Sequence, residues 1–328
     1  MNFPKIFSDR NSKFTAYVNG VINHLTPRYL LSYQIKQKLK HIKDDPNYDY
    51  IMSRVNYYNK LNGEAKNFTL GKKALSVGDF KHRKHQLMYY IDLNNVIRGF
   101  DKKYRYNALF GDITVVPPEP TFVKSRPIAG DNSNSVLLKL NSIRHFNFIK
   151  KDIPYTQKAN SVIFRGKIAL KPHRIDFFEK YFNHPMFNLG DTSTEPSHDN
   201  KEWLAGKISL AEQLKNKFVL CIEGNDVCTS LKWVMSSNSI AVMPRPKYET
   251  WFMEGKLIPN VHYIEIADDY SDAVERVNYY IEHEDEALEI IKNANRFVEQ
   301  FKDKKQEKII GWLVAHKYFN ATNENTSN

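Results

Sequence analysis

The sequence predicts an α/β fold, and three observations support this prediction. After residue 155, short apolar segments of strand length alternate with helical segments of about ten residues, a pattern typical of parallel βαβ units. The chain has 328 residues, which is enough for two domains or one large α/β domain. Apolar residues make up 41% and charged residues 26%, so the composition is that of a folded globular protein.

Helices are predicted at the start of the first half. Apolar residues recur at helical spacing over residues 28–43 and 49–61, with Asp49 as a candidate cap and Gly63 as a candidate stop. The basic cluster at 81–85 that follows is either a solvated loop or part of an anion-binding face.

Extended segments are predicted in the rest of the first half. The apolar runs at 87–91 and 104–110 indicate strands, and the second of them ends in Gly111-Asp112. Ligands of open α/β sheets bind at the carboxyl ends of strands, so Asp112 is a candidate functional residue. Prolines 117, 118 and 120 then predict an extended segment over 121–128.

The second half alternates between strands and helices. The predicted strands are 161–164, 217–222, 239–243 and 262–266. The predicted helices are 172–182, 227–235, 271–283, 285–301 and 306–319. Because the alternation starts near residue 155, we predict two domains, 1–155 and 156–328.

The charge distribution indicates an anionic partner for the first half. Residues 1–160 contain 27 Lys+Arg and 12 Asp+Glu, a net charge of +15, while the remaining 21 Lys+Arg and 25 Asp+Glu give −4, for a total of +11. Nucleic acid, a phosphorylated sugar and an anionic membrane surface all fit this asymmetry.

Several classes of protein are excluded by motif and by hydropathy. No run approaches the roughly 18 apolar residues of a membrane span, and the N-terminus lacks the features of a secretory signal, so we expect a cytoplasmic protein. Cys221 and Cys228 match no common zinc spacing, so buried thiols are expected. There is no P-loop, dinucleotide fingerprint, nucleophile elbow or Asp-x-Asp triplet, which argues against nucleotide hydrolysis, hydride transfer and a metal-held diphosphate.

Two strand-to-helix turns of the second half carry polar and cationic residues. They contain Arg165, Gly166, Lys167 and Arg174 in the first turn, and Glu223, Gly224, Asn225, Asp226, Ser230 and Lys232 in the second. Glycine lets the backbone approach a ligand closely, and amides at a helix start attract phosphate oxygens. The turns are either a phosphate site or ordinary connections of a βα fold.

Several segments together resemble glycosyltransferase family 90, which includes fungal capsule xylosyltransferases, Rumi-type protein O-glucosyltransferases and bacterial lipopolysaccharide core transferases. They are Phe164-Arg165-Gly166, residues 217–225, Ser236-Ser237-Asn238-Ser239, and Val261-His262-Tyr263-Ile264 with residues 268–272. In the first half, Gly111-Asp112, residues 120–128 and Arg144-His145-Phe146 are similar to the bacterial lipopolysaccharide branch in particular. The resemblance spans roughly residues 85–300.

The resemblance implies a GT-B architecture, with two Rossmann-like lobes and the active site in the cleft between them. It implies that 1–155 is the acceptor-side lobe, that 156–328 binds a UDP-sugar, and that the anomeric carbon is inverted without a bound metal. Asp112 matches the family's catalytic aspartate. Ser230 stands where eukaryotic members carry an arginine that contacts the diphosphate, and Lys232 could supply the missing charge.

The site residues implied by the resemblance fall into two groups. The predicted donor-binding residues are Arg165, Gly166, Lys167, Arg174, Gly224, Asn225, Asp226, Ser230, Lys232, Asn238 and Glu249. Glu249 is either a ribose contact or an exposed glutamate at a helix start. Lys124, Ser125 and Arg126 are expected to line the cleft from the first lobe, touching donor or acceptor.

The function implied is that of an inverting glycosyltransferase without a metal cofactor. It would move a glucose-, galactose- or xylose-type sugar from a UDP-sugar to a hydroxyl of lipopolysaccharide core or another surface glycan, at the cytoplasmic side of the inner membrane. Two alternatives stay open: a non-catalytic sugar-nucleotide or glycan-binding protein of the same fold, and a nucleic-acid-binding protein, for which no recognition motif is present.

Overall fold

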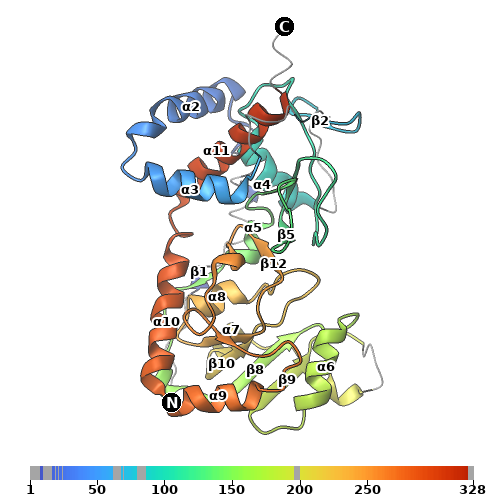
Figure 1. Cartoon of the computed structure of the whole chain (residues 1–328), viewed down its shortest axis with the longest axis vertical. Coiled ribbons are helices and arrows are strands. Elements are labelled where there is room, and N and C mark those ends of the chain that lie inside the picture. Colours follow the sequence, from blue (N-terminus) through green and yellow to red (C-terminus); the bar gives the residue numbers. More distant parts are fainter. Residues whose placement is uncertain are drawn as a thin grey trace. The chain divides into compact units, whose positions relative to one another are not determined.

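The computed structural model describes residues 8–9, 17–18, 20, 22–23, 25–61, 68, 70–79, 86–195 and 200–323. The chain divides into two compact units, each built from segments that are distant in sequence (Figure 1). Unit 1 comprises Met1–Arg10, His145–Pro246 and Lys256–Gln300, and unit 2 comprises Asn11–Arg144, Lys247–Gly255 and Phe301–Asn328. Gly63 and the basic cluster at 81–85 lie outside the described residues.

A five-stranded parallel sheet forms the centre of unit 1. Its strands are β8 (Ala159–Gly166), β9 (Phe187–Asp191), β10 (Asn216–Leu220), β11 (Ile240–Met243) and β13 (Ile264–Glu265). They lie in the order β13-β11-β10-β8-β9, and every neighbouring pair is parallel. Figure 1 labels three of these strands, β10, β8 and β9. The predicted α/β class with parallel strands is therefore confirmed. β9 was not predicted, because its asparagine and glycine are depleted in strands.

Helices of unit 1 follow the strands along the chain. They are α6 (Pro172–Tyr181), α7 (Leu210–Gln213), α8 (Leu231–Met235), α9 (Ala273–Glu282) and α10 (Glu284–Glu299). Pro172 begins α6, where its missing N–H costs no hydrogen bond. The core between sheet and helices combines aliphatic side chains with contacting aromatic rings: the Phe177 ring lies 5.4 Å from Phe187 and 5.1 Å from Tyr270. A two-stranded sheet of β1 (Ser8–Asp9) and β7 (Phe148–Ile149) completes the described part of the unit.

Unit 2 is mainly helical. Its helices are α2 (Arg28–His41), α3 (Tyr48–Tyr58), α4 (Leu87–Ile97) and α11 (Lys304–Asn323), and α5 (Ser142–His145) lies where the two units meet in sequence. The strand pairs are β2 (Leu75–Ser76) with β3 (Arg105–Tyr106), β4 (Thr121–Val123) with β6 (Ser135–Leu137), and β5 (Ser125–Pro127) with β12 (Tyr248–Thr250). Within the described residues these sheets have two strands each, so the second Rossmann-like lobe of a GT-B fold is not confirmed.

The units differ from the predicted domains at residues 1–10, 145–155, 247–255 and 301–328, and the last of these segments contains α11. The Tyr318 ring of α11 lies 4.1 Å from the Phe122 ring of β4, and its hydroxyl donates to the Pro120 carbonyl at 2.9 Å. These contacts hold the C-terminal helix in unit 2, with the helices of the first half. The predicted division into domains 1–155 and 156–328 stays a prediction.

The predicted strand at 87–91 was wrong, because these residues begin helix α4. Leu87-Met88-Tyr89-Tyr90-Ile91 is a continuous apolar run, and periodicity alone does not separate a buried strand from a buried helix in such a run. Burial of Leu93 and Ile97 one turn apart shows the helical spacing.

A carboxyl group on α4 makes stability depend on pH. Asp92 accepts hydrogen bonds from the backbone N–H and the hydroxyl of Ser142, at 2.8 and 3.1 Å. Burial nevertheless raises the pKa of Asp92 to about 7. Since this pKa is above the unfolded value of about 4, the folded state binds the proton more tightly, and stability falls as the pH rises from about 4 to about 7.

We therefore expect Asp92→Asn, which has no proton to lose, to be less sensitive to pH than the wild type. Between pH 5 and pH 8, urea titrations should show a loss of unfolding free energy that is smaller in the variant by about 1–2 kcal/mol. Equal losses in both proteins would show that Asp92 is ionised throughout this range.

Candidate functional site at the carboxyl edge of the parallel sheet

The carboxyl ends of all five parallel strands meet at one edge of the sheet in unit 1. Along the chain, the strand order corresponds to 2-1-3-4-5, which reverses direction between β8 and β10. Ligands of open α/β sheets bind outside the carboxyl ends of the strands at such a switch point. The two turns singled out in the sequence follow β8 and β10, so the structure places both of them there.

Arg174 joins the two turns. From α6, its Nη1 donates to the Lys167 carbonyl at 2.7 Å in the first turn. Its Nη2 and Nε donate to the carbonyls of Ile222 and Glu223 in the second, at 2.9 and 2.8 Å. The side chain is buried, and its guanidinium lies 5.3 Å from the centre of the Phe164 ring. Arg174 therefore fixes the shape of the site, whereas the sequence predicted a direct donor contact.

The first turn offers a close backbone approach and an exposed cation. A Cβ atom at Gly166 would lie 2.8 Å from Cζ of Phe164, so only glycine fits this position. Lys167 is exposed beside it. Arg165 points elsewhere, because its guanidinium donates to the backbone carbonyl of Asn188 at 2.8 Å and to its side-chain oxygen at 2.7 Å. Lys167 is thus the cation that this turn presents to solvent.

The second turn combines exposed and buried residues. Asn225 is exposed beside the half-buried Gly224, whereas Asp226 and Lys232 are buried. With Lys232 fully buried on α8, its ammonium group is not presented at the surface of the turn. Ser230 precedes α8 without a capping hydrogen bond from its side chain, and its hydroxyl lies 3.1 Å from the Cys228 sulfur.

Both cysteines lie in this second turn region, and both are buried thiols, as expected. The hydrogen bond from Cys221, with help from Ser230 and the charge of Arg174, lowers the pKa of Cys228 to about 6. Burial raises the pKa of Cys221 instead. The hydrogen bond between the two thiols moves their pKa values in opposite directions, and the charge of Arg174 makes a smaller contribution to the shift of Cys228.

Asn238 does not lie with the other predicted donor residues. It precedes β11, so it lies at the amino-terminal edge of the sheet, opposite the switch point. Its backbone N–H donates to Asp152 at 2.7 Å, and its side chain donates to the Ile153 carbonyl at 3.0 Å. The prediction of Asn238 as a donor contact does not fit this position.

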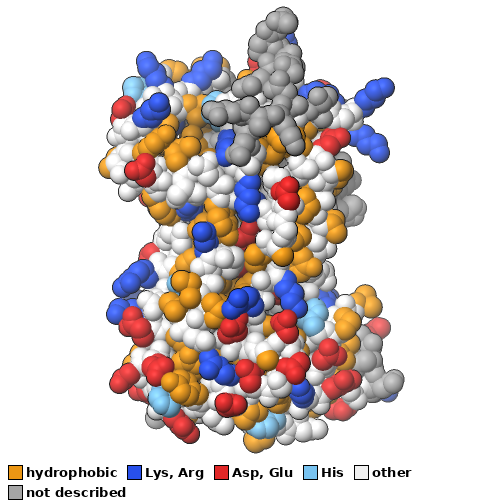
Figure 2. Space-filling model, viewed as in Figure 1, with side chains coloured by type: hydrophobic (Ala, Val, Ile, Leu, Met, Phe, Trp, Pro, Cys, Tyr) orange, Lys and Arg blue, Asp and Glu red, His pale blue; other side chains and the backbone are white. Residues whose placement is uncertain are grey.

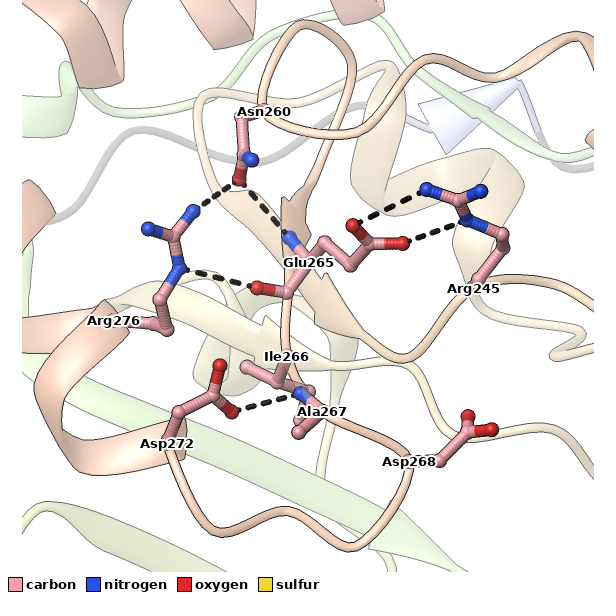
Figure 3. Close-up of a pocket in the computed structure, with 8 residues that line it drawn as sticks. All are labelled: Arg245, Asn260, Glu265, Ile266, Ala267, Asp268, Asp272 and Arg276. Atoms are coloured by element: carbon pink, nitrogen blue, oxygen red, sulfur yellow. Dashed lines mark hydrogen bonds and ion pairs between the residues drawn. The ribbon is translucent and has the colours of Figure 1, made fainter.

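A cavity of about 510 Å³ opens at the same carboxyl edge, beyond β11 and β13 (Figure 3). It is lined by Arg245, Asn260, Glu265, Ile266, Ala267, Asp268, Asp272 and Arg276. Arg245 Nε donates to Glu265 at 2.9 Å, and Arg276 donates to Asn260 at 2.5 Å. Asp272 accepts from the Ala267 N–H at 2.8 Å, while Figure 3 shows the Asp268 carboxylate turned away from these groups.

Sequence reasoning assigned no role to this cavity. The one sequence feature that pointed to it is that Asp268 and Asp272 lie in a segment similar to the glycosyltransferase family. Arg245 and Arg276 are 31 positions apart in sequence, and only the adjacency of β11 and β13 brings their elements together.

In unit 2, Lys124 and Ser125 contact the loop that carries the candidate base Asp112. Its carboxylate is paired with the Lys124 ammonium at 2.5 Å, with the Asp112 side chain 27% exposed and the Lys124 side chain 2% exposed. The Ser125 hydroxyl accepts from the Ile113 N–H and donates to the Ile113 carbonyl, both at 3.0 Å. Lys124 and Ser125 therefore position the loop that carries Asp112.

Arg126 and Glu249 form a buried ion pair inside unit 2. Arg126 Nε donates to Glu249 at 2.8 Å, and the Tyr57 hydroxyl donates to the same carboxylate. Glu249 lies on β12, which pairs with β5, so it is not at a helix start, and it belongs to unit 2 although the predicted donor lobe, 156–328, includes it. Arg126 is fully buried in this ion pair, and its expected contact with donor or acceptor in the cleft stays a prediction. The pair holds β5 and β12 together.

Within the described residues, no group of three or more His, Cys, Asp or Glu side chains is arranged to hold a metal ion. None of the helices in these ranges is both long enough and apolar enough to cross a membrane.

Comparison with known proteins identifies the family. The family model described as Glycosyl transferase family 90 matches residues 118–310. The O-glucosyltransferase LpsA of Dichelobacter nodosus is 40% identical over 273 residues, which cover 82% of this chain and 82% of that protein. Both matches include the two turns joined by Arg174. The chain therefore belongs to glycosyltransferase family 90, as its sequence motifs suggested.

Proposed function

We propose that the protein transfers glucose from UDP-glucose to a hydroxyl of lipopolysaccharide core or another surface glycan, with inversion at the anomeric carbon. The observation that carries this proposal is the switch point of the parallel sheet, where Arg174 joins two turns that suit a diphosphate. The glucose donor is supported by the O-glucosyltransferase relative. The GT-B fold and a cytoplasmic, peripheral membrane location belong to the same proposal.

The donor extends along the carboxyl edge of the sheet in this proposal. Gly166 and Gly224 let the diphosphate approach the backbone, and the exposed Lys167 compensates its charge. β13 is two strands away from β10, a separation of about 10 Å that a nucleoside diphosphate can span. The nucleoside then reaches the cavity, where Asp268 or Asp272 accepts hydrogen bonds from ribose hydroxyls in the role that the sequence had offered to Glu249.

The reaction is a single displacement in which Asp112 is the general base. The acceptor oxygen forms a bond to the anomeric carbon while the bond from that carbon to the diphosphate oxygen breaks on the opposite face. Asp112 takes the proton of the acceptor hydroxyl. The negative charge that develops on UDP is stabilised by Lys167, a contact that contributes about 2–4 kcal/mol in the transition state, and by the positive charge of Arg174 behind the two turns.

The function is tested by measuring UDP release from a panel of UDP-sugars with purified core oligosaccharides as acceptors. UDP-glucose is expected to give the highest kcat/KM, and product analysis should show the inverted anomer. Tight binding of UDP-glucose without turnover on any acceptor would favour the non-catalytic alternative.

Metal independence is tested by chelation. Because protein cations stabilise the leaving group in this proposal, we expect EDTA to leave the rate of transfer largely unchanged. The control is a parallel assay in which EDTA is followed by excess Mn²⁺. A loss of activity that Mn²⁺ restores would contradict the metal-free mechanism.

A further inference from the structure

Exposed apolar side chains gather near the start of the described part of unit 2. They are Ile22 (58% exposed), Leu25 (73%), Tyr29 (71%), Leu30 (41%) and Tyr33 (62%). Single exposed apolar residues are ordinary, but such a run marks an interaction surface. Leu31 and Ile35 are buried, so α2 packs through one face and exposes the other.

The same helix is basic. α2 contains Arg28, Lys36, Lys38 and Lys40 and no Asp or Glu. Lys36, Lys38 and Lys40 follow the exposed tyrosines on α2 and are not in ion pairs with any other described residue. In Figure 2, Lys and Arg side chains project where Figure 1 labels α2. Tyrosines beside lysines are the side chains that suit the interface between lipid headgroups and acyl chains.

A groove of about 540 Å³ runs beside α2 within unit 2. Its lining includes the cations Arg28, Lys36 and Lys102 against one acid, Asp101. Burial and the neighbouring Arg98 lower the pKa of Arg28, while Asp101 opposes this shift. With three cations against one acid, the groove has a net positive charge that a bound anionic group would balance.

The groove also has apolar walls and opens onto the exposed face. Ile35, Leu39 and Phe100 line it, which suits a ligand that carries hydrocarbon next to its anionic group. Tyr29 and Lys36 belong both to the groove and to the exposed face, so the two form one continuous surface.

We propose that α2 and the groove beside it are the docking surface of this protein for an anionic phospholipid bilayer. Tyr29, Leu30 and Tyr33 enter the headgroup region, and the lysines contact lipid phosphates. The proposal rests on the peripheral membrane location in the proposed function. Vesicle binding requires no transferase activity, so the two proposals can fail separately.

The test is sedimentation of the full chain with vesicles of phosphatidylcholine and phosphatidylglycerol in equal amounts, compared with pure phosphatidylcholine. Binding is expected only to the anionic vesicles and is expected to weaken with salt. Lys36→Gln/Lys38→Gln/Lys40→Gln should weaken it roughly 100-fold. Tyr29→Ser/Tyr33→Ser should weaken it roughly 10-fold.

Two control variants carry matched changes at exposed positions elsewhere. Lys201→Gln/Lys304→Gln/Lys305→Gln removes the same charge, and Leu170→Ser/Ile258→Ser removes exposed apolar area. Both are expected to bind anionic vesicles like the wild type. Equal losses in the control and α2 variants, equal binding to both kinds of vesicle, or retention by oligonucleotides instead of vesicles would overturn the proposal.

Discussion

Replacing Asp112 by asparagine is expected to lower turnover by roughly 10²–10⁴-fold while the affinity for UDP-glucose persists. Asparagine has nearly the same shape as aspartate but does not accept the proton of the acceptor hydroxyl. The donor contacts proposed above come from unit 1, and Asp112 is part of unit 2. The measurements are donor affinity by calorimetry and turnover by UDP release.

A second aspartate of unit 2 provides the control for this experiment. Asp131 accepts a hydrogen bond from the Ser133 N–H at 3.0 Å in a turn, a role that asparagine also fills. Asp131→Asn should therefore keep both turnover and donor affinity. Near-normal turnover of Asp112→Asn would show that Asp112 is a turn residue like Asp131 and that another residue activates the acceptor.

Replacing Arg174 by lysine is expected to weaken UDP binding by about 10- to 100-fold. The guanidinium donates to three carbonyls in two turns through three different nitrogens, and the single nitrogen of lysine does not span them. The backbone carbonyls that lose the Arg174 hydrogen bonds also lower the free energy of unfolding by about 2–4 kcal/mol. Calorimetry with UDP and urea titration measure the two effects separately.

Arg54 is the matched control, because it is a buried arginine of unit 2. It pairs with Glu307 at 2.7 Å and donates to the Tyr58 hydroxyl at 2.6 Å. Arg54→Lys should cost a similar amount of stability without changing UDP affinity. If Arg174→Lys also leaves UDP affinity unchanged, Arg174 serves stability alone and the diphosphate binds elsewhere.

The sequence by itself determined the parts of this protein that depend on local pattern. Apolar segments of strand length, each followed by a turn and a helix, predicted β8, β10, β11 and β13 and their parallel arrangement. Glycines and cations at two of these turns predicted either a phosphate site or ordinary connections of a βα fold. Asp112 became the candidate base through its place after a strand-like segment and its match to the family's catalytic aspartate.

Tertiary structure alone decided the parts that depend on residues distant in sequence. An apolar run such as 87–91 is compatible with a buried strand and with a buried helix, and in the folded protein it forms a helix. From sequence, Glu249 was either a ribose contact or an exposed glutamate. In the structure, β12 pairs with β5, and this pairing buries the Glu249 carboxylate against Arg126.

The roles of the polar side chains show the same limit of sequence reasoning. Lys124 and Arg174 were expected to touch substrate, yet Lys124 pairs with Asp112 and Arg174 fixes two turns. The cavity beyond β13 was not predicted, although Asp268 and Asp272 of its lining lie in a segment similar to the glycosyltransferase family. A sequence shows which groups are charged, but their partners follow from long-range packing, because a buried charge must find its hydrogen bonds wherever the folded chain provides them.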